Sequence, residues 1–531
     1  MAAERPDLNM SPQATPYLFT IHYYLLLPPL GPGSIWPEDL FLYGKGVNMK
    51  KILKFIPLGA AVLLLAVTGL FCAAVLRAGL LPGLWTALLF AGLFLLDGLL
   101  IFLCARTEKK GRLITGLVLA LLFVLGLCFG TVVLNKTVKA LRRITETAPE
   151  FSRACVYVRT EDEAQSIEDL SGDIFGVLPP GLLNDTEEAL SQINEGLGLS
   201  VQTREYAGLG DLLDALLTGE IRCVILNPEL LAIAGELGAY DMLDEQLRII
   251  TELHIQTPDE PLTSPAPETE ETEDHCFSVY VSGIDTFGDV SVKSRSDVNI
   301  IVSVNTLTHQ ILMITTPRDY YVPLPISNGD RDKLTHAGIY GIDVSKGALE
   351  MLYDTQIDYY FRVNFTGFEK IIDAIGGIDA ELEGYPGVMH LNGEEALKHA
   401  RNRSAGDQWR GRNQVRIIQA AINKLLSRSV LVAFDNLLDA TEGSFQTTVP
   451  YELMAGLVRE QLASNPQWEI LRYSVSGTGD SRVPFTTMIM DGKPMRLYVM
   501  WPDEEDVADG IEMLKAMHRD EVIQLPEDYE H

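Results

Sequence analysis

Three long apolar runs near the N-terminus constrain this chain more than any other feature of its sequence. They cover residues 55–76, 83–105 and 113–134, and each is close to the ~20 residues that an α-helix needs to cross a bilayer. A cleaved signal peptide has one shorter apolar segment instead of a set of three. The runs therefore predict three transmembrane helices, and they leave the rest of the chain for soluble domains.

Basic residues beside these runs predict their orientation. Lys50, Lys51 and Lys54 precede the first run, and residues 106–112 between the second and third runs include four Lys or Arg. Because cytoplasmic connections are enriched in Lys and Arg, everything after the third run is expected outside the cell. Asp97, the charged residue within the second run, either faces the neighbouring helices or has a function in the membrane.

Residues 1–48 contain several prolines and no helical or strand periodicity, which predicts a disordered leader. The alternative is a misplaced start, with translation beginning at Met49. Residues 44–48 can be back-translated to a DNA sequence that contains AAAGGAGT. This sequence resembles a bacterial ribosome-binding site, and it lies at a suitable distance from a start codon at Met49. N-terminal sequencing of the native protein distinguishes the two.

Net charge and cysteine placement restrict the kinds of site that the chain can carry. It has 42 Lys and Arg against 72 Asp and Glu, a formal charge of −30, which disfavours a nucleic-acid surface over the whole molecule. Cys155, Cys223 and Cys276, which lie outside the apolar runs, lack zinc-ligand spacing. Cys155 and Cys223 lie in strand-like runs and are expected to be buried thiols, with a disulfide as the alternative.

The region from about 150 to 255 alternates strand-like and amphipathic helical runs, which predicts a small accessory α/β domain. ACVYVRT and IRCVILN are typical of buried strands, and LGDLLDALLTGE is typical of a helix that ends at Gly219. The order weakly resembles one lobe of a periplasmic solute-binding protein, and a spacer or a docking module explains it equally well. Residues 256–275, rich in Pro and acids, predict an extended linker.

Beyond this linker, three strand-like runs predict an antiparallel meander: CFSVYVSGID, SDVNIIVSVN and QILMITTPRD. In such a meander Asp285 ends the first strand, Asp297 opens the second and Arg318 follows the third. All three side chains are then expected at one edge of the sheet. The alternative is that they are ordinary turn and surface residues.

The segment LNGEEALKHARNRSAGDQWRGRNQVR is rich in arginine. Asn392 and Glu395 have the spacing of a capping box at the start of a helix. Arg401 and Arg403 follow that helix, and they point the same way if the chain is extended there.

A second helix is expected in the same segment. Arg410 and Gln414 share one of its faces, and Arg412 and Arg416 share another. Five arginines in 16 residues, with Asp407 as the one acid among them, predict a local phosphate site, because guanidinium groups bind phosphate bidentately. The alternative is a solvated basic face; nucleic acid is disfavoured because the region is expected outside the cell.

Seven motifs in order resemble those of the LytR-CpsA-Psr family: GID, SRSDVNII, TTPRDYYVPLP, DKLTHAGIYG, IDYYFRVNFTGFEKIIDAIGGID, LNGEEALKHARNR and DQWRGRNQ. The resemblance covers about residues 277–430. It implies a mixed α/β catalytic domain with a central sheet at 276–440, and a C-terminal extension at 441–531 packed on it. THAGIYG, where many members have an Asn-Ala-rich segment, and Asn413, where they often have Arg, indicate a clostridial-like subgroup.

The resemblance also implies roles for individual residues. A pyrophosphate head group is expected to be bound by Arg318, Arg401, Arg403, Arg410 and Gln414. Asp285 and Asp297 are expected to serve a magnesium ion and the reacting phosphate, and Asp319 to orient Arg318. A polyprenyl tail is expected in an apolar groove, for which NIIVSV, ILMITT and FEKIIDAI are candidates, although such runs are equally ordinary core.

The implied activity is transfer of a glycopolymer phosphate from a polyprenyl pyrophosphate carrier to peptidoglycan, with Mg²⁺ as cofactor. The implied catalytic residues are Asp285, Asp297, Arg318, Arg401 and Arg403. Phosphoryl transfer needs positioning and charge neutralisation, and either aspartate can accept the proton of the attacking hydroxyl. The alternatives are a surface regulator that senses polyprenyl phosphates without turnover, and a pyrophosphate hydrolase that uses the same site.

Overall fold

The structure is a computed structural model of the chain. It describes residues 49–105, 110–145, 149–179, 186–198, 200–236, 240, 242–256, 275–402, 404, 407–425, 427, 443–486, 489–490 and 493–526. The predictions for residues 1–48 and for the linker, at 257–274, lie outside the described residues.

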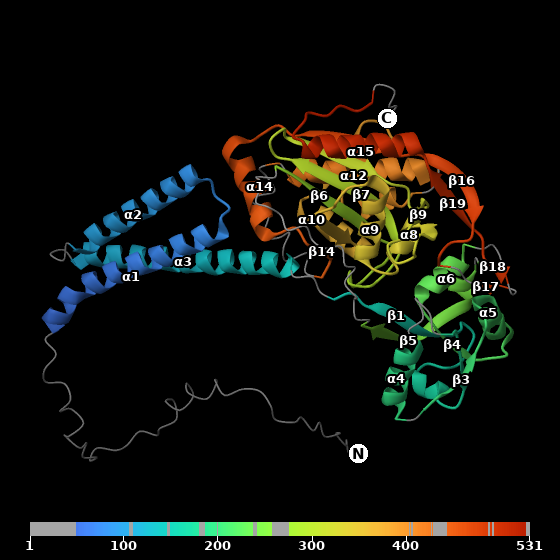
Figure 1. Ribbon diagram of the computed structural model, residues 1–531. Helices are drawn as coiled ribbons and strands as arrows, with labels where there is room; N and C mark the ends of the chain where they lie inside the picture. Colours follow the sequence, from blue (N-terminus) through green and yellow to red (C-terminus); the bar gives the residue numbers. More distant parts are fainter. Residues whose placement is uncertain are drawn as a thin grey trace, which may run out of the picture.

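Three apolar helices form an elongated bundle that projects from the soluble part of the molecule (Figure 1). They are α1 (Met49–Ala78), α2 (Gly83–Ala105) and α3 (Lys110–Thr145). Each is long and apolar enough to cross a membrane, which confirms the three predicted helices. Asp97 is buried between the helices at 1% exposure, and therefore faces its neighbours and not lipid.

A six-stranded mixed sheet, with the order β14-β11-β6-β7-β8-β15, forms the centre of the region from 275 to 526. This region includes the expected catalytic domain and is called the catalytic region below. Its strands are β6 (Cys276–Ile284), β7 (Ser296–Asn305), β8 (Gln310–Thr315), β11 (Tyr359–Val363), β14 (Phe445–Thr447) and β15 (Glu469–Ser474). The predicted antiparallel meander is β6, β7 and β8. The edge strands β14 and β15 come from the segment that was expected only to pack on this domain.

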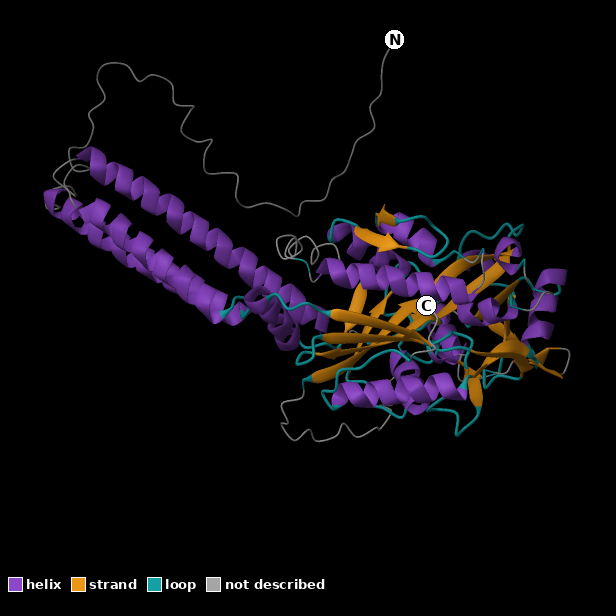
Figure 2. Cartoon of the chain, turned by 90° about the horizontal axis from the view of Figure 1, so that it is seen from above, coloured by secondary structure: helices purple, strands orange, loops and turns teal. Residues whose placement is uncertain are grey.

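Helices cover both faces of this sheet (Figure 2). They are α9 (Ile342–Tyr353) and α15 (Glu504–His518) on one face, and α10 (Phe365–Ala374), α11 (Gly393–Ala400) and α12 (Asp407–Leu425) on the other. Strand alternation produces this arrangement: Ile301 packs in the cluster with α9 and α15, and Ile300 packs against Val415 of α12. The sheet is therefore buried on both sides.

Smaller elements complete the catalytic region. They are β9 (Tyr321–Pro323), β10 (Arg331–Lys333), α8 (Leu334–Ala337), β12 (Ile378–Glu381), β13 (Val388–Leu391), α14 (Tyr451–Ser464), β16 (Gly477–Arg482), β17 (Ile489–Met490), β18 (Lys493–Pro494) and β19 (Leu497–Pro502). The helix α14 also contacts the bundle, where the Tyr451 hydroxyl donates to the Ala78 carbonyl at 2.5 Å.

The accessory domain is a five-stranded mixed sheet with helices, in the order β3-β2-β4-β1-β5. Its elements are β1 (Ser152–Arg159), η2 (Ile167–Leu170), β2 (Ile174–Val177), α4 (Thr186–Leu197), β3 (Gln202–Glu205), α5 (Leu209–Thr218), β4 (Cys223–Leu226), α6 (Pro228–Ala234), α7 (Leu243–Gln246) and β5 (Leu247–Ile255). The predicted buried strands are β1 and β4, and α5 ends at Gly219 in the left-handed region, with φ 80°. Cys155 and Cys223 are buried free thiols.

The accessory domain packs directly against the catalytic region. Ile339, Met495 and Leu497 of the catalytic region belong to the same buried apolar cluster as β1, β4 and α5. Ahead of β1, Glu150 pairs with the buried side chain of Arg362 on β11. The two soluble domains therefore share a buried interface.

Candidate active site

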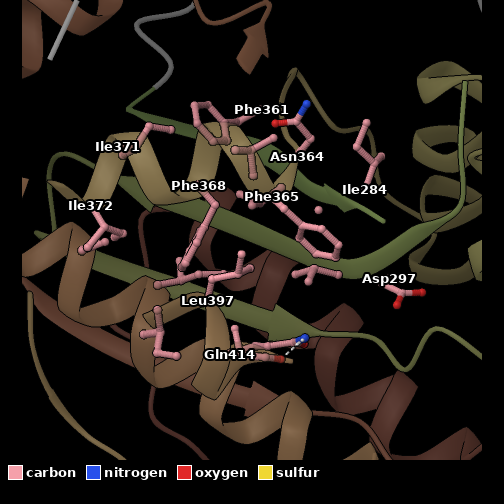
Figure 3. A pocket seen from close by; sticks show the side chains of 18 of the residues that line it. Ile284, Asp297, Phe361, Asn364, Phe365, Phe368, Ile371, Ile372, Leu397 and Gln414 are labelled. Carbon is pink, nitrogen blue, oxygen red and sulfur yellow. Dashed lines mark hydrogen bonds between the residues drawn. The ribbon is translucent and has the colours of Figure 1, made fainter. Parts of the chain in front are cut away.

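An apolar cavity of about 730 Å³ lies between the sheet and the helices α10, α11 and α12. This volume falls within the about 300–1,000 Å³ typical of small-molecule sites. Its walls are mostly aliphatic and aromatic, as Figure 3 shows, and polar groups gather where β6 ends and β7 begins. These polar residues are Asp285, Asp297, Asn364, Arg401, Arg410 and Gln414.

Two of the three runs expected to line an apolar groove do so. NIIVSV contributes Val302, and FEKIIDAI contributes Phe368, Ile371 and Ile372. The expectation for ILMITT was wrong: this run forms β8, which lies beyond β7 in the sheet order, and the cavity lies over β11, β6 and β7. Met313 of this run is core, packed with Val415.

Asp297, the second residue of β7, is held by Arg318. The Nη1 of Arg318 donates to both carboxylate oxygens of Asp297, at 3.0 and 3.1 Å, and the Thr335 hydroxyl donates at 3.4 Å. Burial works to raise the pKa of Asp297, but the positive charges of Arg318 and Arg410 outweigh it and hold that pKa below its usual value. Asp297 is therefore a carboxylate at neutral pH.

Asp285 directly follows β6 and lies at the same end of the cavity. Arg295 donates from Nη2 to its Oδ2 at 3.2 Å. Burial first, and then the negative charge of Asp297, raise the pKa of Asp285 above its usual value, although Arg295 opposes them. The two strand ends thus bring two carboxylates close enough to repel each other.

The loop after Asp285 is fixed by the start of α10. The Asn364 side chain accepts from the Gly367 N–H at 2.8 Å as the cap of α10, an interaction worth about 1 kcal/mol. Its amide nitrogen also donates to the Gly288 carbonyl at 2.8 Å, and Gly288 has φ +94°, which glycine adopts without strain. The side chain of Asn364 therefore joins the start of α10 to the loop that follows Asp285.

Arg401 closes the helix α11 at this mouth. The predicted capping box is present, with the Asn392 side chain accepting from the Glu395 N–H at 2.9 Å. The expected extended exit was wrong at Arg401, which is the C-cap residue and has helical angles, φ −94° and ψ −5°. Its guanidinium lies over the Phe365 ring, 4.3 Å from the centroid. Arg403 lies outside the described residues.

The two faces of α12 separate as their spacing predicts. Arg410 and Gln414 line the cavity, and Gln414 donates to the Ala400 carbonyl at 3.0 Å. Arg412 turns away and binds Glu383 through Nε at 2.5 Å and Nη2 at 2.9 Å, and Arg416 donates to the Glu381 carbonyl at 3.4 Å.

Asn413 has a structural role. It is fully buried, and its side-chain oxygen accepts from the Glu383 N–H at 2.8 Å. This contact joins α12 to the segment after β12. At this position, where members of the family often have arginine, the asparagine of this chain therefore supports the fold of the site.

Two basic residues of the site were not predicted from the sequence. Arg295 contacts Asp285, and Lys333 places its Nζ 3.0 Å from Asp319 Oδ1. Asp319 was expected to orient Arg318, but its contact to the Arg318 Nε is longer, at 3.7 Å. The signal for Arg295 was its position two residues before Asp297 in SRSDVNII, since alternate residues of extended chain share a side.

The arrangement suits an amphiphilic ligand with an anionic head and a long apolar tail. The arginines at the mouth can neutralise phosphate charge, and the aliphatic walls can bury a hydrocarbon chain. The two carboxylates suit Mg²⁺, which takes oxygen ligands and is commonly bound by one or two carboxylates together with substrate phosphates. Within the described residues there is no cluster of three or more His, Cys, Asp or Glu side chains that could hold a metal ion.

Comparison with known proteins gives the same family from sequence. Residues 252–496 match the LytR_cpsA_psr family. The chain is 30% identical over 237 residues to the polyisoprenyl-teichoic acid–peptidoglycan teichoic acid transferase TagU of Bacillus cereus strain AH820, covering 42% of this chain and 77% of that protein. It is 32% identical over 185 residues to the enzyme TagT of Bacillus subtilis strain 168, covering 31% of this chain and 57% of that one.

Solved structures of such proteins also resemble part of the chain. The crystal structure of B. subtilis TagV is 27% identical, covers 48% of this chain and all of its own, and has a TM-score of 0.39. A structure of TagT bound to LI-WTA is 24% identical, covers 46% of this chain and 92% of its own, and has a TM-score of 0.38. With the family match over its catalytic region and a relative at 30% identity, this chain belongs to the LytR-CpsA-Psr family.

Proposed function

We propose that the chain is a membrane-anchored transferase that moves a glycopolymer phosphate from a polyprenyl pyrophosphate carrier to peptidoglycan. One observation carries the proposal: charged residues, among them Asp285, Asp297 and Arg401, line an otherwise apolar cavity of about 730 Å³. A polyprenyl pyrophosphate has this division between head and tail. The names of the relatives, which are polyisoprenyl-teichoic acid–peptidoglycan transferases, support the same substrate class.

The polar residues at the charged end of the cavity have different roles in phosphoryl transfer. Arg401, Arg410 and Gln414 bind the pyrophosphate, and Arg318 assists while it holds Asp297. Arg403 follows Arg401 by two residues and is proposed to join this set. Charge neutralisation and positioning are the main needs of such a reaction, and the arginines supply both.

The reaction balances with the lipid-linked glycan and peptidoglycan as its two reactants. A hydroxyl of a peptidoglycan sugar attacks the phosphorus that carries the glycan, and the bond from that phosphorus to the bridging oxygen breaks. The glycan phosphate is then joined to peptidoglycan, and polyprenyl phosphate leaves. The hydroxyl proton passes to Asp285 or Asp297.

Mg²⁺ is proposed as the cofactor, held by Asp285 and Asp297. Two observations support the fit. Both carboxylates face the same cavity. The pKa of Asp285 is raised by burial first and then by the negative charge of Asp297, and a cation relieves this repulsion. When bound, the ion neutralises negative charge on the pyrophosphate and the leaving phosphate.

The catalytic and accessory domains are proposed to lie outside the cell. Lys50, Lys51 and Lys54 at the start of α1 and the basic residues between α2 and α3 favour a cytoplasmic position for those ends. The soluble domains follow α3, which ends on the opposite side. Peptidoglycan, the proposed acceptor, is then directly accessible.

The test is transfer of a labelled glycan from its polyprenyl pyrophosphate to a peptidoglycan oligomer by the full chain in detergent with Mg²⁺. Arg318→Ala and Arg401→Ala serve as site variants. Label on peptidoglycan that both variants lose supports the proposal. Label released to water indicates a hydrolase, and lipid that binds but stays unchanged indicates a sensor; either result overturns the proposal.

A further inference from the structure

The short helix α6 of the accessory domain, labelled in Figure 1, and the segment just after it contact the catalytic region through charged and polar side chains at Ser294, Arg295 and Lys333. Asn227 caps α6 and accepts from the Glu229 N–H at 2.9 Å. Glu229 is only 5% exposed, and Glu236 comes directly after the helix and its Gly235 cap. Both carboxylates contact basic residues of the catalytic region.

Glu229 begins the first of two series of charged contacts. Its carboxylate accepts from the Ser294 hydroxyl at 2.8 Å and lies 3.3 Å from the Arg295 Nε. On its other edge, Arg295 donates from Nη2 to Asp285 at 3.2 Å. Glu229 therefore lies at the Nε edge of the guanidinium as an ion-pair partner, while a terminal nitrogen of the same guanidinium is directed at Asp285.

Glu236 begins the second series. It accepts from the Lys333 Nζ at 2.7 Å, and the same Nζ lies 3.0 Å from Asp319. Asp319 lies 3.7 Å from the Arg318 Nε, and Arg318 in turn holds Asp297 at 3.0 Å. Both series therefore start in the accessory domain and end at one of the two carboxylates of the cavity.

Adhesion between the domains does not explain these charges. The interface already contains buried apolar contacts from Ile339, Met495 and Leu497 and the pair between Glu150 and Arg362. A buried ion pair contributes little net stability relative to apolar residues, because desolvation offsets its attraction. What a buried ion pair provides instead is a fixed relative position of its two side chains.

We propose that Glu229 and Glu236 are positioning residues of the active site, so that the accessory domain completes it. They fix Arg295 and Lys333, and through them Asp285 and Asp297, before substrate arrives. Side chains that are already ordered lose less entropy on binding and reaction. The proposal rests on the proposed function in taking these two aspartates as the reacting carboxylates.

The test compares Glu229→Gln and Glu236→Gln with the full-length wild type. Glu220→Gln is the matched control, because Glu220 pairs with Arg204 at 2.6 Å on the exposed surface of the same domain. Calorimetry with Mg²⁺ measures binding of farnesyl pyrophosphate, a short-tailed probe for the head-group site, and steady-state transfer gives kcat and KM for the long-tailed substrate.

Each site variant is expected to bind the probe about 30-fold more weakly, the smaller end of the effects seen when a buried charge pair loses a partner. The kcat should fall by more than KM rises, because the tail still holds the substrate. Glu220→Gln should match wild type. Glu236→Asp, which keeps the charge at a partly exposed position, should recover most of the binding and remains informative if Glu229→Gln does not fold.

Several outcomes overturn the proposal. Site variants that behave like Glu220→Gln show that the contacts are only structural, and tighter probe binding shows that the carboxylates compete with phosphate. If wild type binds the probe but does not transfer glycan, the proposed function fails, while the binding ratios still decide the role of Glu229 and Glu236. If wild type does not bind the probe, both proposals fail.

Discussion

The accessory domain and the catalytic region are both mixed sheets packed with helices, but they use their arginines differently. Arg222 of the accessory domain is held within that domain by Asp162 at 2.9 Å and Asp173 at 3.0 Å. Arg401 and Arg410 of the catalytic region line an apolar cavity. The difference shows that fold class does not locate the function; convergence of charged groups on a cavity does.

The largest expected effect comes from removing a cavity arginine. Arg401→Ala is expected to lower the rate of glycan transfer by about 100-fold or more, the usual cost of losing one group that stabilises transition-state charge. Steady-state transfer kinetics measure it. Arg412→Ala is the matched control, because Arg412 binds Glu383 on the other face of α12. Equal losses in both variants would contradict the division of α12 into two faces.

Filling the apolar part of the cavity should have the next largest effect. Val302→Phe adds bulk from β7 into the cavity and is expected to raise KM for a long polyprenyl substrate about tenfold, in line with overpacking costs of about 1–3 kcal/mol. A farnesyl substrate should be less affected. Similar KM changes for both tail lengths would place the tail elsewhere.

Breaking the arginine contact of the accessory domain should affect stability and leave catalysis unchanged. Asp162→Asn is expected to destabilise that domain by about 1 kcal/mol, a modest value because Arg222 is a third exposed and solvent screens the pair. Thermal unfolding at neutral pH measures it, and transfer at a temperature where both proteins are folded should not change. A large loss of transfer would instead assign this pair to the active site.

The smallest expected effect is the change in stability that Asp162→Asn causes at low pH. The hydrogen bond from Arg222, the largest cause, holds the pKa of Asp162 below its usual value, so its stabilisation is present above the unfolded-state pKa of about 4. It is lost as pH falls through the lower folded-state pKa. The stability difference between wild type and Asp162→Asn should therefore shrink toward zero in acid, and an unchanged difference at low pH would exclude the charge as its origin.

Much of the fold could be predicted because local patterns and packing agree. The apolar runs gave the bundle, the alternation in β6, β7 and β8 gave the meander, and Asn392 with Glu395 gave the start of α11. The edge strand β14 was not predicted, because it spans only Phe445–Thr447 and pairs with β11, which lies far from it in sequence.

The candidate site was predicted where residues are close in sequence or share a strand end, as with Asp285 and Asp297. Its contacts to the accessory domain were not, because Glu229 and Lys333 are separated from their partners by a linker or by many residues, and neither carries a local signal. The helical angles of Arg401 were missed because the sequence carries no clear stop signal at this point, and Arg401 keeps helical angles as the C-cap of α11.

The most direct test of the central claim follows the phosphorus atom. A polyprenyl pyrophosphate glycan with ³²P at the glycan-side phosphate is incubated with the full-length chain, Mg²⁺ and a peptidoglycan oligomer. The label is expected to become covalently bound to peptidoglycan, and unlabelled polyprenyl phosphate is expected to appear in equal amount. Label that stays on the lipid, or that is released as a soluble glycan phosphate, would contradict it.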